Sequence, residues 1–189
     1  HAQCLLQRQR RPWTIRRASY NFEEIHCEHG IPQDLPAVYD YGNCDDFVLP
    51  EDMIDEVKFV MGPAIRDHKF TIAMGGDHSG NIPIIQCFED KDIAMISVDA
   101  HLDSRDEYMG SRNSHACITG RAADHLGIDN VFALGMRSIS EEELEMDEVI
   151  PYISAYDIHE KGIGWAVKKA LDSAKAEKIY LTLDIDGID

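Results

Sequence analysis

The feature that most constrains this sequence is an apolar run that ends in closely spaced acidic and histidine side chains. The run Ile93–Val98 leads directly into Asp99, His101 and Asp103. Such a run is typical of a buried strand, and alternate residues of an extended segment point to the same side. The three polar side chains are therefore expected to face one point just beyond the strand.

Two further apolar runs end in the same way. Phe70–Met74 is followed by the motif GGDHS, which contains His78. Ile179–Leu183 is followed by Asp184 and Asp186, again at alternate positions. In an open parallel sheet, ligands bind beyond the carboxyl ends of the strands. If these strands are neighbours, their polar side chains converge on one site.

Helical patterns separate the apolar runs, and Val131–Leu134 is a fourth predicted strand. Helices are predicted over residues 53–65, 81–88, 116–126 and 165–176, with a further start at Ser140. The acidic run 141–145 that follows is expected to be a solvated helix face. Strands that alternate with helices pair in parallel. We therefore predict a single α/β domain over residues 1–189, with three αβα layers and a mainly parallel sheet.

Composition excludes several classes of function. The net charge is −17, from 18 basic and 35 acidic residues, which disfavours nucleic-acid binding and favours cations. The five cysteines are widely spaced without a CxxC pair, so we expect neither a disulfide framework nor a zinc ribbon. No apolar run approaches the ~18–20 residues of a membrane helix. We expect a cytoplasmic protein without membrane or nucleic-acid partners.

The polar residues at the strand ends are predicted to bind metal. The candidate ligands are His78, Asp99, His101, Asp103, Asp184 and Asp186. Without cations these groups would repel one another or stay poorly solvated. An oxygen-rich set without thiolate suits Mn²⁺ or Mg²⁺, and it exceeds the needs of one small ion. Two metals that share carboxylates are therefore predicted.

Together these motifs resemble a known family. GGDHS, SVDAHLDSRDE with a downstream SHAC, and LTLDIDGID are similar to the three signature blocks of the ureohydrolases, which include arginases and agmatinases. PWTIRRASYNFEE and VFALGMRS extend the resemblance over Pro12–Asp189. The loop after the second block is most similar to prokaryotic, especially archaeal, agmatinases.

The resemblance implies an arginase-like fold with two Mn²⁺ ions. By this resemblance, Asp99 and Asp184 would bridge the two metals. His78 and Asp103 would complete one metal site, and His101 and Asp186 would complete the other. His115, in SHAC, matches the family histidine that moves protons to the leaving amine, whereas Asp77 would have a supporting role. The implied reaction is amidinohydrolysis of a small cationic guanidino substrate, with agmatine giving putrescine and urea.

Substrate choice stays open at this point. Asp106 and Glu107 would favour a distal ammonium, whereas Arg105 and Arg112 would favour a carboxylate. The alternatives within the family are a guanidinobutyrase, an arginase or a formimidoylglutamase. A single-zinc deacetylase of related architecture would not need all six ligands. A truncated, non-catalytic relative is the remaining alternative.

In the family the third block continues into a further third of the domain, with a substrate-facing glutamate and more strands. We therefore expect the domain to be partial, incomplete at its C-terminus. Residues 1–189 alone are expected to be poorly soluble and hydrolytically inactive. The full-length protein is expected to form a homotrimer or homohexamer, as the family does.

Overall fold

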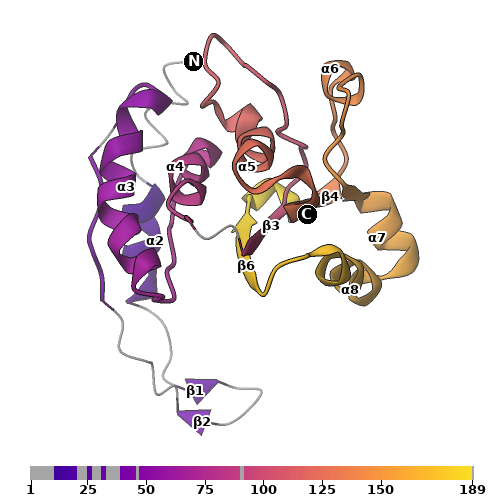
Figure 1. Cartoon of the computed structure of the whole chain (residues 1–189). Helices are drawn as coiled ribbons and strands as arrows, with labels where there is room; N and C mark the ends of the chain where they lie inside the picture. Colours follow the sequence, from indigo (N-terminus) through magenta and orange to yellow (C-terminus); the bar gives the residue numbers. More distant parts are fainter. Residues whose placement is uncertain are drawn as a thin grey trace.

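A four-stranded parallel sheet lies at the centre of the computed structural model, which describes residues 11–20, 25–26, 31–32, 39–45, 47–89 and 92–188 (Figure 1). Its strands are β3 (Ile93–Val98), β4 (Val131–Met136), β5 (Tyr152–Ser154) and β6 (Lys178–Leu183). Their order is β5-β4-β3-β6, and every pairing is parallel, as predicted. A separate antiparallel pair joins β1 (Ile25–His26) to β2 (Ile31–Pro32).

Helices precede the sheet in the chain and separate its strands. They are α2 (Arg11–Ser19), α3 (Pro50–Arg66), α4 (Asn81–Ile85), α5 (Ile118–Leu126), α6 (Glu141–Leu144), α7 (Ala155–Lys161) and α8 (Ile163–Ser173). Short 3-10 turns are η1 (His78–Gly80), η2 (His115–Cys117), η3 (Ile128–Asn130) and η4 (Ile185–Gly187). The sequence predicted α3, α4, α5, α6 and α8 with shifted ends, but it missed α2, α7 and β5. The segment PWTIRRASYNFEE falls partly outside the described residues.

The two faces of the sheet carry separate halves of the core. Met95 and Ala133 pack with Ile118 and other residues of α4 and α5. Ile96 packs on the opposite face with Ala166 of α8. Neighbouring residues of a strand point to opposite faces, so the central strands β3 and β4 contribute to both halves. Figure 1 shows α4 and α5 on one side of the sheet and α7 and α8 on the other, which confirms the three-layer αβα architecture.

The prediction of a strand over Phe70–Met74 is wrong. The segment forms no strand, and the side chains of Phe70 and Ile72 are 94% and 76% exposed. A strand requires a neighbour to hydrogen-bond, and no strand in the described part of the chain pairs with this segment. The segment nevertheless delivers the GGDHS motif to the end of the sheet, where η1 and α4 follow.

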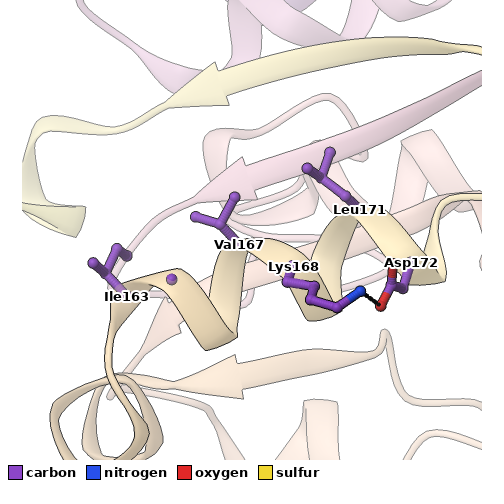
Figure 2. Close-up of a pocket in the computed structure, with 6 residues that line it drawn as sticks. Ile163, Val167, Lys168, Leu171 and Asp172 are labelled. Atoms are coloured by element: carbon purple, nitrogen blue, oxygen red, sulfur yellow. Dashed lines mark hydrogen bonds and ion pairs between the residues drawn. The ribbon is translucent and has the colours of Figure 1, made fainter.

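The last predicted strand forms, but the prediction that it is buried is wrong. Leu181 pairs in register with Ile96 and therefore faces the α8 layer, yet it is 61% exposed. The reason is that β6 is the edge of the sheet and α8 packs over its middle. Val167 and Leu171 of α8 are also exposed, and with Ile163 they line a shallow apolar depression of about 410 Å³ (Figure 2).

The lengths of the helices bear on the question of a membrane-spanning segment. No helix in the described part of the chain is both long and apolar enough to cross a bilayer.

Candidate metal centre

Backbone hydrogen bonds bring the ends of three neighbouring strands together. The amide of Asp99 donates to the carbonyl of Leu134 at 3.0 Å, and the amide of Asp184 donates to the carbonyl of Val98 at 2.9 Å. The amide of Ala100 donates to Asp186 Oδ1 at 3.1 Å. These contacts continue the β4-β3-β6 pairing past the strands and place the segments 99–103 and 184–186 at the same end of the sheet.

One group of predicted ligands forms around His78. Its Nδ1 atom lies 3.0 Å from Asp99 Oδ2 and 3.2 Å from Asp103 Oδ2. Its Nε2 atom lies 3.0 Å from Thr182 Oγ1, which holds the ring from the other side. The donor atoms of His78, Asp99 and Asp103 lie within 4.8 Å of one another, as a common ion would require.

A second group shares one residue with the first. His101 Nδ1 lies 3.2 Å from Asp186 Oδ2 and 3.6 Å from Asp99 Oδ1. The donor atoms of Asp99, His101 and Asp186 also lie within 4.8 Å of one another. Asp99 thus turns one oxygen toward each group, which is the arrangement of a carboxylate that bridges two ions.

Asp184 lies beside these groups rather than within either of them. Its Oδ2 atom is 3.7 Å from His78 Nδ1, and its Oδ1 atom accepts a hydrogen bond from the amide of Asp186 at 3.1 Å. The structure therefore brings five of the six predicted ligands into two groups and places the sixth next to His78. Its bridging role stays a prediction.

His115 lies at the rim of this centre. Its Nδ1 atom is 3.8 Å from Asp77 Oδ2, and Asp77 directly precedes the ligand His78. The ring of Tyr108 meets the imidazole edge-on, with centroids 5.6 Å apart. The side chain of His115 is 45% exposed, so its ring is accessible to solvent and to small molecules.

Burial and neighbouring charges perturb the protonation of these groups. Burial lowers the pKa of His78, but its hydrogen bonds to Asp103 and Asp99 outweigh this effect and raise the pKa to about 9. Burial raises the pKa of Asp99, but its hydrogen bonds with His78 and the amide of His101 leave it below the ordinary value. Burial is also the main reason why the pKa of Asp103 is raised.

A divalent cation fits this donor set. Asp99 is only 1% exposed, and its Oδ2 atom lies 3.0 Å from His78 Nδ1 without a hydrogen bond of good geometry to any described residue. A buried carboxylate oxygen without a hydrogen bond is costly unless a cation compensates it. Imidazole nitrogen and carboxylate oxygen are the donor types that suit Mn²⁺ or Mg²⁺.

Close backbone packing holds the third block against the second. A Cβ atom placed on Gly187 would lie 2.8 Å from the amide nitrogen of Asp99 and 2.9 Å from the carbonyl carbon of Val98. Gly135 has φ +92° and its Cβ atom would lie 3.1 Å from the carbonyl oxygen of Asp99. Only glycine lets the chain approach so closely at Gly187.

We expect Gly187→Ala to lower the free energy of unfolding by about 1–3 kcal/mol, because the added methyl group overpacks against backbone that cannot turn aside. Gly164→Ala is the matched control, since a Cβ atom at Gly164 meets nothing within 4 Å. Urea unfolding of both variants measures the difference. Equal stability of the two variants would contradict the close approach.

The charged loop after the second block is largely paired with itself. Asp106 Oδ1 accepts hydrogen bonds from Arg112 Nη2 at 2.7 Å and Arg121 Nη2 at 2.9 Å. The guanidinium of Arg105 lies over the ring of Tyr108, 4.9 Å from its centroid. The sequence suggested Asp106 as a contact for a substrate ammonium and Arg112 as a contact for a substrate carboxylate. In the structure they neutralise each other.

Thr182 is a site residue that the sequence argument missed. The signal was present, because Thr182 is a polar residue within the apolar run of β6, two positions before Asp184. Period-two alternation places both on the same side of the strand.

Comparisons with known proteins agree with this fold. The agmatinase of Bacillus subtilis (strain 168) is 31% identical over 184 residues, which are 94% of this chain and 61% of that protein. The N(1)-aminopropylagmatine ureohydrolase of Synechocystis sp. is 30% identical over 142 residues, 72% of this chain and 45% of that protein. The solved structure of the agmatine ureohydrolase of Thermoplasma volcanium superposes with a TM-score of 0.87 at 34% identity, covering 95% of this chain and 61% of that one.

The αβα fold with ligand-type residues at its strand ends is that of the ureohydrolase class. The model of the arginase family matches residues 9–189, and the chain belongs to this family. It spans about 61% of the length of the Bacillus agmatinase. The resemblance read from the three motifs is confirmed.

Proposed function

We propose that the complete protein is a dimanganese amidinohydrolase that converts agmatine to putrescine and urea. The observation that carries this proposal is the pair of ligand groups that share Asp99, in a chain of the arginase family. Its relatives at about 30% identity include several named agmatinases. The domain over residues 1–189, its cytoplasmic location and assembly into a homotrimer or homohexamer are proposed with it, on the family resemblance.

The proposed metal-binding roles follow the geometry. His78 and Asp103 would hold one Mn²⁺ and His101 and Asp186 the other, with Asp99 between them. Asp184, whose Oδ2 atom lies 3.7 Å from His78 Nδ1, is proposed as the second bridging ligand on the family resemblance. Two bound ions would lower the pKa of a water molecule and so supply a nucleophile near neutral pH.

His115 is proposed as the group that protonates the leaving amine. Cleavage of the guanidino C–N bond leaves an amine that needs a proton, and an imidazole is suited to transfer one near neutral pH. The ring is exposed beside the ligand segment, with Asp77 on one side and Tyr108 on the other. These neighbours would orient the ring without binding metal.

Three features of the chain favour agmatine over a carboxylated substrate. Arg112 is already paired with Asp106, and Arg105 lies over Tyr108, so neither guanidinium is offered freely to a carboxylate. Glu107 is exposed in the same loop and could meet a distal ammonium. The strongly acidic composition would attract a dication.

The test is a comparison of kcat/KM for agmatine, arginine and 4-guanidinobutyrate, using the intact protein with Mn²⁺. Agmatine is expected to be preferred by at least about tenfold, since one unmatched buried charge or polar group costs 1–3 kcal/mol or more. Preference for either carboxylated substrate would overturn the agmatinase assignment. Absence of urea release from all of them would favour a non-catalytic relative.

A further inference from the structure

Glu143 is a buried carboxylate in a part of the chain that the sequence predicted to be solvated. It is 4% exposed, whereas its neighbours Glu142 and Leu144 are exposed. It lies on the one-turn helix α6, which begins after Ser140 with a capping box. The prediction of a solvated face therefore holds for its neighbours and is wrong for Glu143.

The carboxylate of Glu143 connects two separate segments. Its Oε2 atom accepts hydrogen bonds from the amide and hydroxyl of Ser140, at 2.9 and 2.8 Å. Its Oε1 atom accepts from the amide and hydroxyl of Ser104, at 2.8 and 3.2 Å. The capping box requires only the contacts to Ser140. The contacts to Ser104, which lies 39 residues away in the sequence, serve another purpose.

Both oxygen atoms are used as acceptors, so the structure selects the charged form. Burial raises the pKa of Glu143, but the hydrogen bonds from Ser140 and Ser104 outweigh burial and lower it below its ordinary value. A buried carboxylate is tolerated when its lone pairs are satisfied by donors in this way. Loss of this acceptor would leave the buried amide of Ser104 without a hydrogen bond and would lower the stability of the fold, so the contact between Glu143 and Ser104 is expected to persist.

Ser104 directly follows the metal-ligand candidate Asp103. Asp103 has φ +55°, a left-handed conformation that is uncommon outside glycine. On its other side, the amide of Thr119 donates to the carbonyl of Asp103 at 3.0 Å, and the hydroxyl of Thr119 donates to the carbonyl of Leu102 at 2.6 Å. The backbone around Asp103 is thus held by α5 on one side and by Glu143 on the other.

We propose that Glu143 is a positioning residue for Asp103: by binding Ser104 it holds Asp103 in the left-handed conformation that turns its carboxylate toward His78. This inference rests on the proposed metal centre and adds a residue to it that binds no metal. Groups that orient ligands from behind commonly change metal affinity when they are removed. Only the ion of the group formed by His78, Asp99 and Asp103 should depend on Glu143.

The first test replaces Glu143 with glutamine. Glutamine has almost the same shape, but its amide group would present a donor to the donors of Ser104 or Ser140. In the intact protein, Glu143→Gln is expected to weaken one of the two Mn²⁺ sites by about 10- to 100-fold, as measured by calorimetric titration. Glu142→Gln is the matched control, because it removes the same charge from an exposed neighbour.

The electron paramagnetic resonance spectrum of bound Mn²⁺ distinguishes this positioning role from a general loss of stability. Glu143→Gln at intermediate Mn²⁺ is expected to show the resonance of isolated ions, where the wild type shows a coupled pair. A partly unfolded protein would instead lose both ions together. Affinities of both sites within twofold of those of Glu142→Gln would overturn the proposal. Failure of the wild type to bind two ions would overturn the proposed metal centre itself.

A second pair of variants keeps the test decisive if Glu143→Gln does not fold. Ser104→Ala and Ser140→Ala each remove one hydroxyl donor from Glu143, and Ser140→Ala also removes the helix cap. A positioning role predicts that Ser104→Ala weakens one Mn²⁺ site by about 2- to 10-fold, the equivalent of one hydrogen bond. Ser140→Ala should lower stability more and affinity less. The opposite order would overturn the proposal.

Discussion

Asp99→Ala is expected to abolish the binding of both metal ions in the intact protein, and hydrolysis with it. Asp99 is the residue that the two ligand groups have in common, with Oδ2 3.0 Å from His78 and Oδ1 3.6 Å from His101. Each remaining group would keep only two of its three members. The loss of a shared carboxylate also removes the negative charge that holds two cations close together.

Metal content after dialysis, measured for the variant and the wild type in parallel, checks this expectation. Two ions per chain are expected for the wild type and none for Asp99→Ala. Asp103→Ala should lose only one ion, because Asp103 belongs to one group. Asp147→Ala removes an exposed carboxylate and should change nothing. Retention of both ions by Asp99→Ala would refute the shared role.

His115→Ala is expected to lower kcat by about 10²–10⁴-fold while both metal ions stay bound. This range is the usual contribution of one positioned proton-transfer group. His115 belongs to neither ligand group and touches Asp77 rather than a ligand, so its removal should leave the ions in place. The KM for agmatine should change much less than kcat, since the proton is needed only as the C–N bond breaks.

His159→Ala is the matched control, because His159 is an exposed histidine on α7, outside both ligand groups. Steady-state urea release and metal content are measured for both variants. A kcat for His115→Ala equal to that of His159→Ala would rule out the proton-transfer role. Loss of metal from His115→Ala would show that the residue supports the ligands instead.

The positions of the ligand candidates could be predicted from the sequence because they depend on local periodicity. Asp99 and His101 follow β3 at alternate positions, as an extended exit from the strand would place them, whereas Asp103 has a left-handed conformation that periodicity does not predict. The parallel pairing followed from strands that alternate with helices. The two ligand groups bear out the expectation that these segments converge.

Other features depended on partners that are distant in the sequence. Phe70–Met74 has the apolar pattern of a strand, but no strand in the described residues hydrogen-bonds to it. Leu181 has the pattern of a buried residue, but β6 lies at the edge of the sheet and α8 does not cover it. The local hydrophobic pattern indicates which secondary structure a segment can form. Whether the segment is paired and buried depends on the strands and helices that pack beside it.

The sequence alone thus determined the alternation of strands and helices, the family and the residues that are candidates for metal binding. Only the tertiary structure decided that Glu143 is buried against Ser104 and that Gly187 must be a glycine. It also showed that Asp106 is neutralised by Arg112. Each of these depends on contacts between segments that are separate in the sequence or on a specific loop conformation, and hydrophobic periodicity carries no information about such contacts.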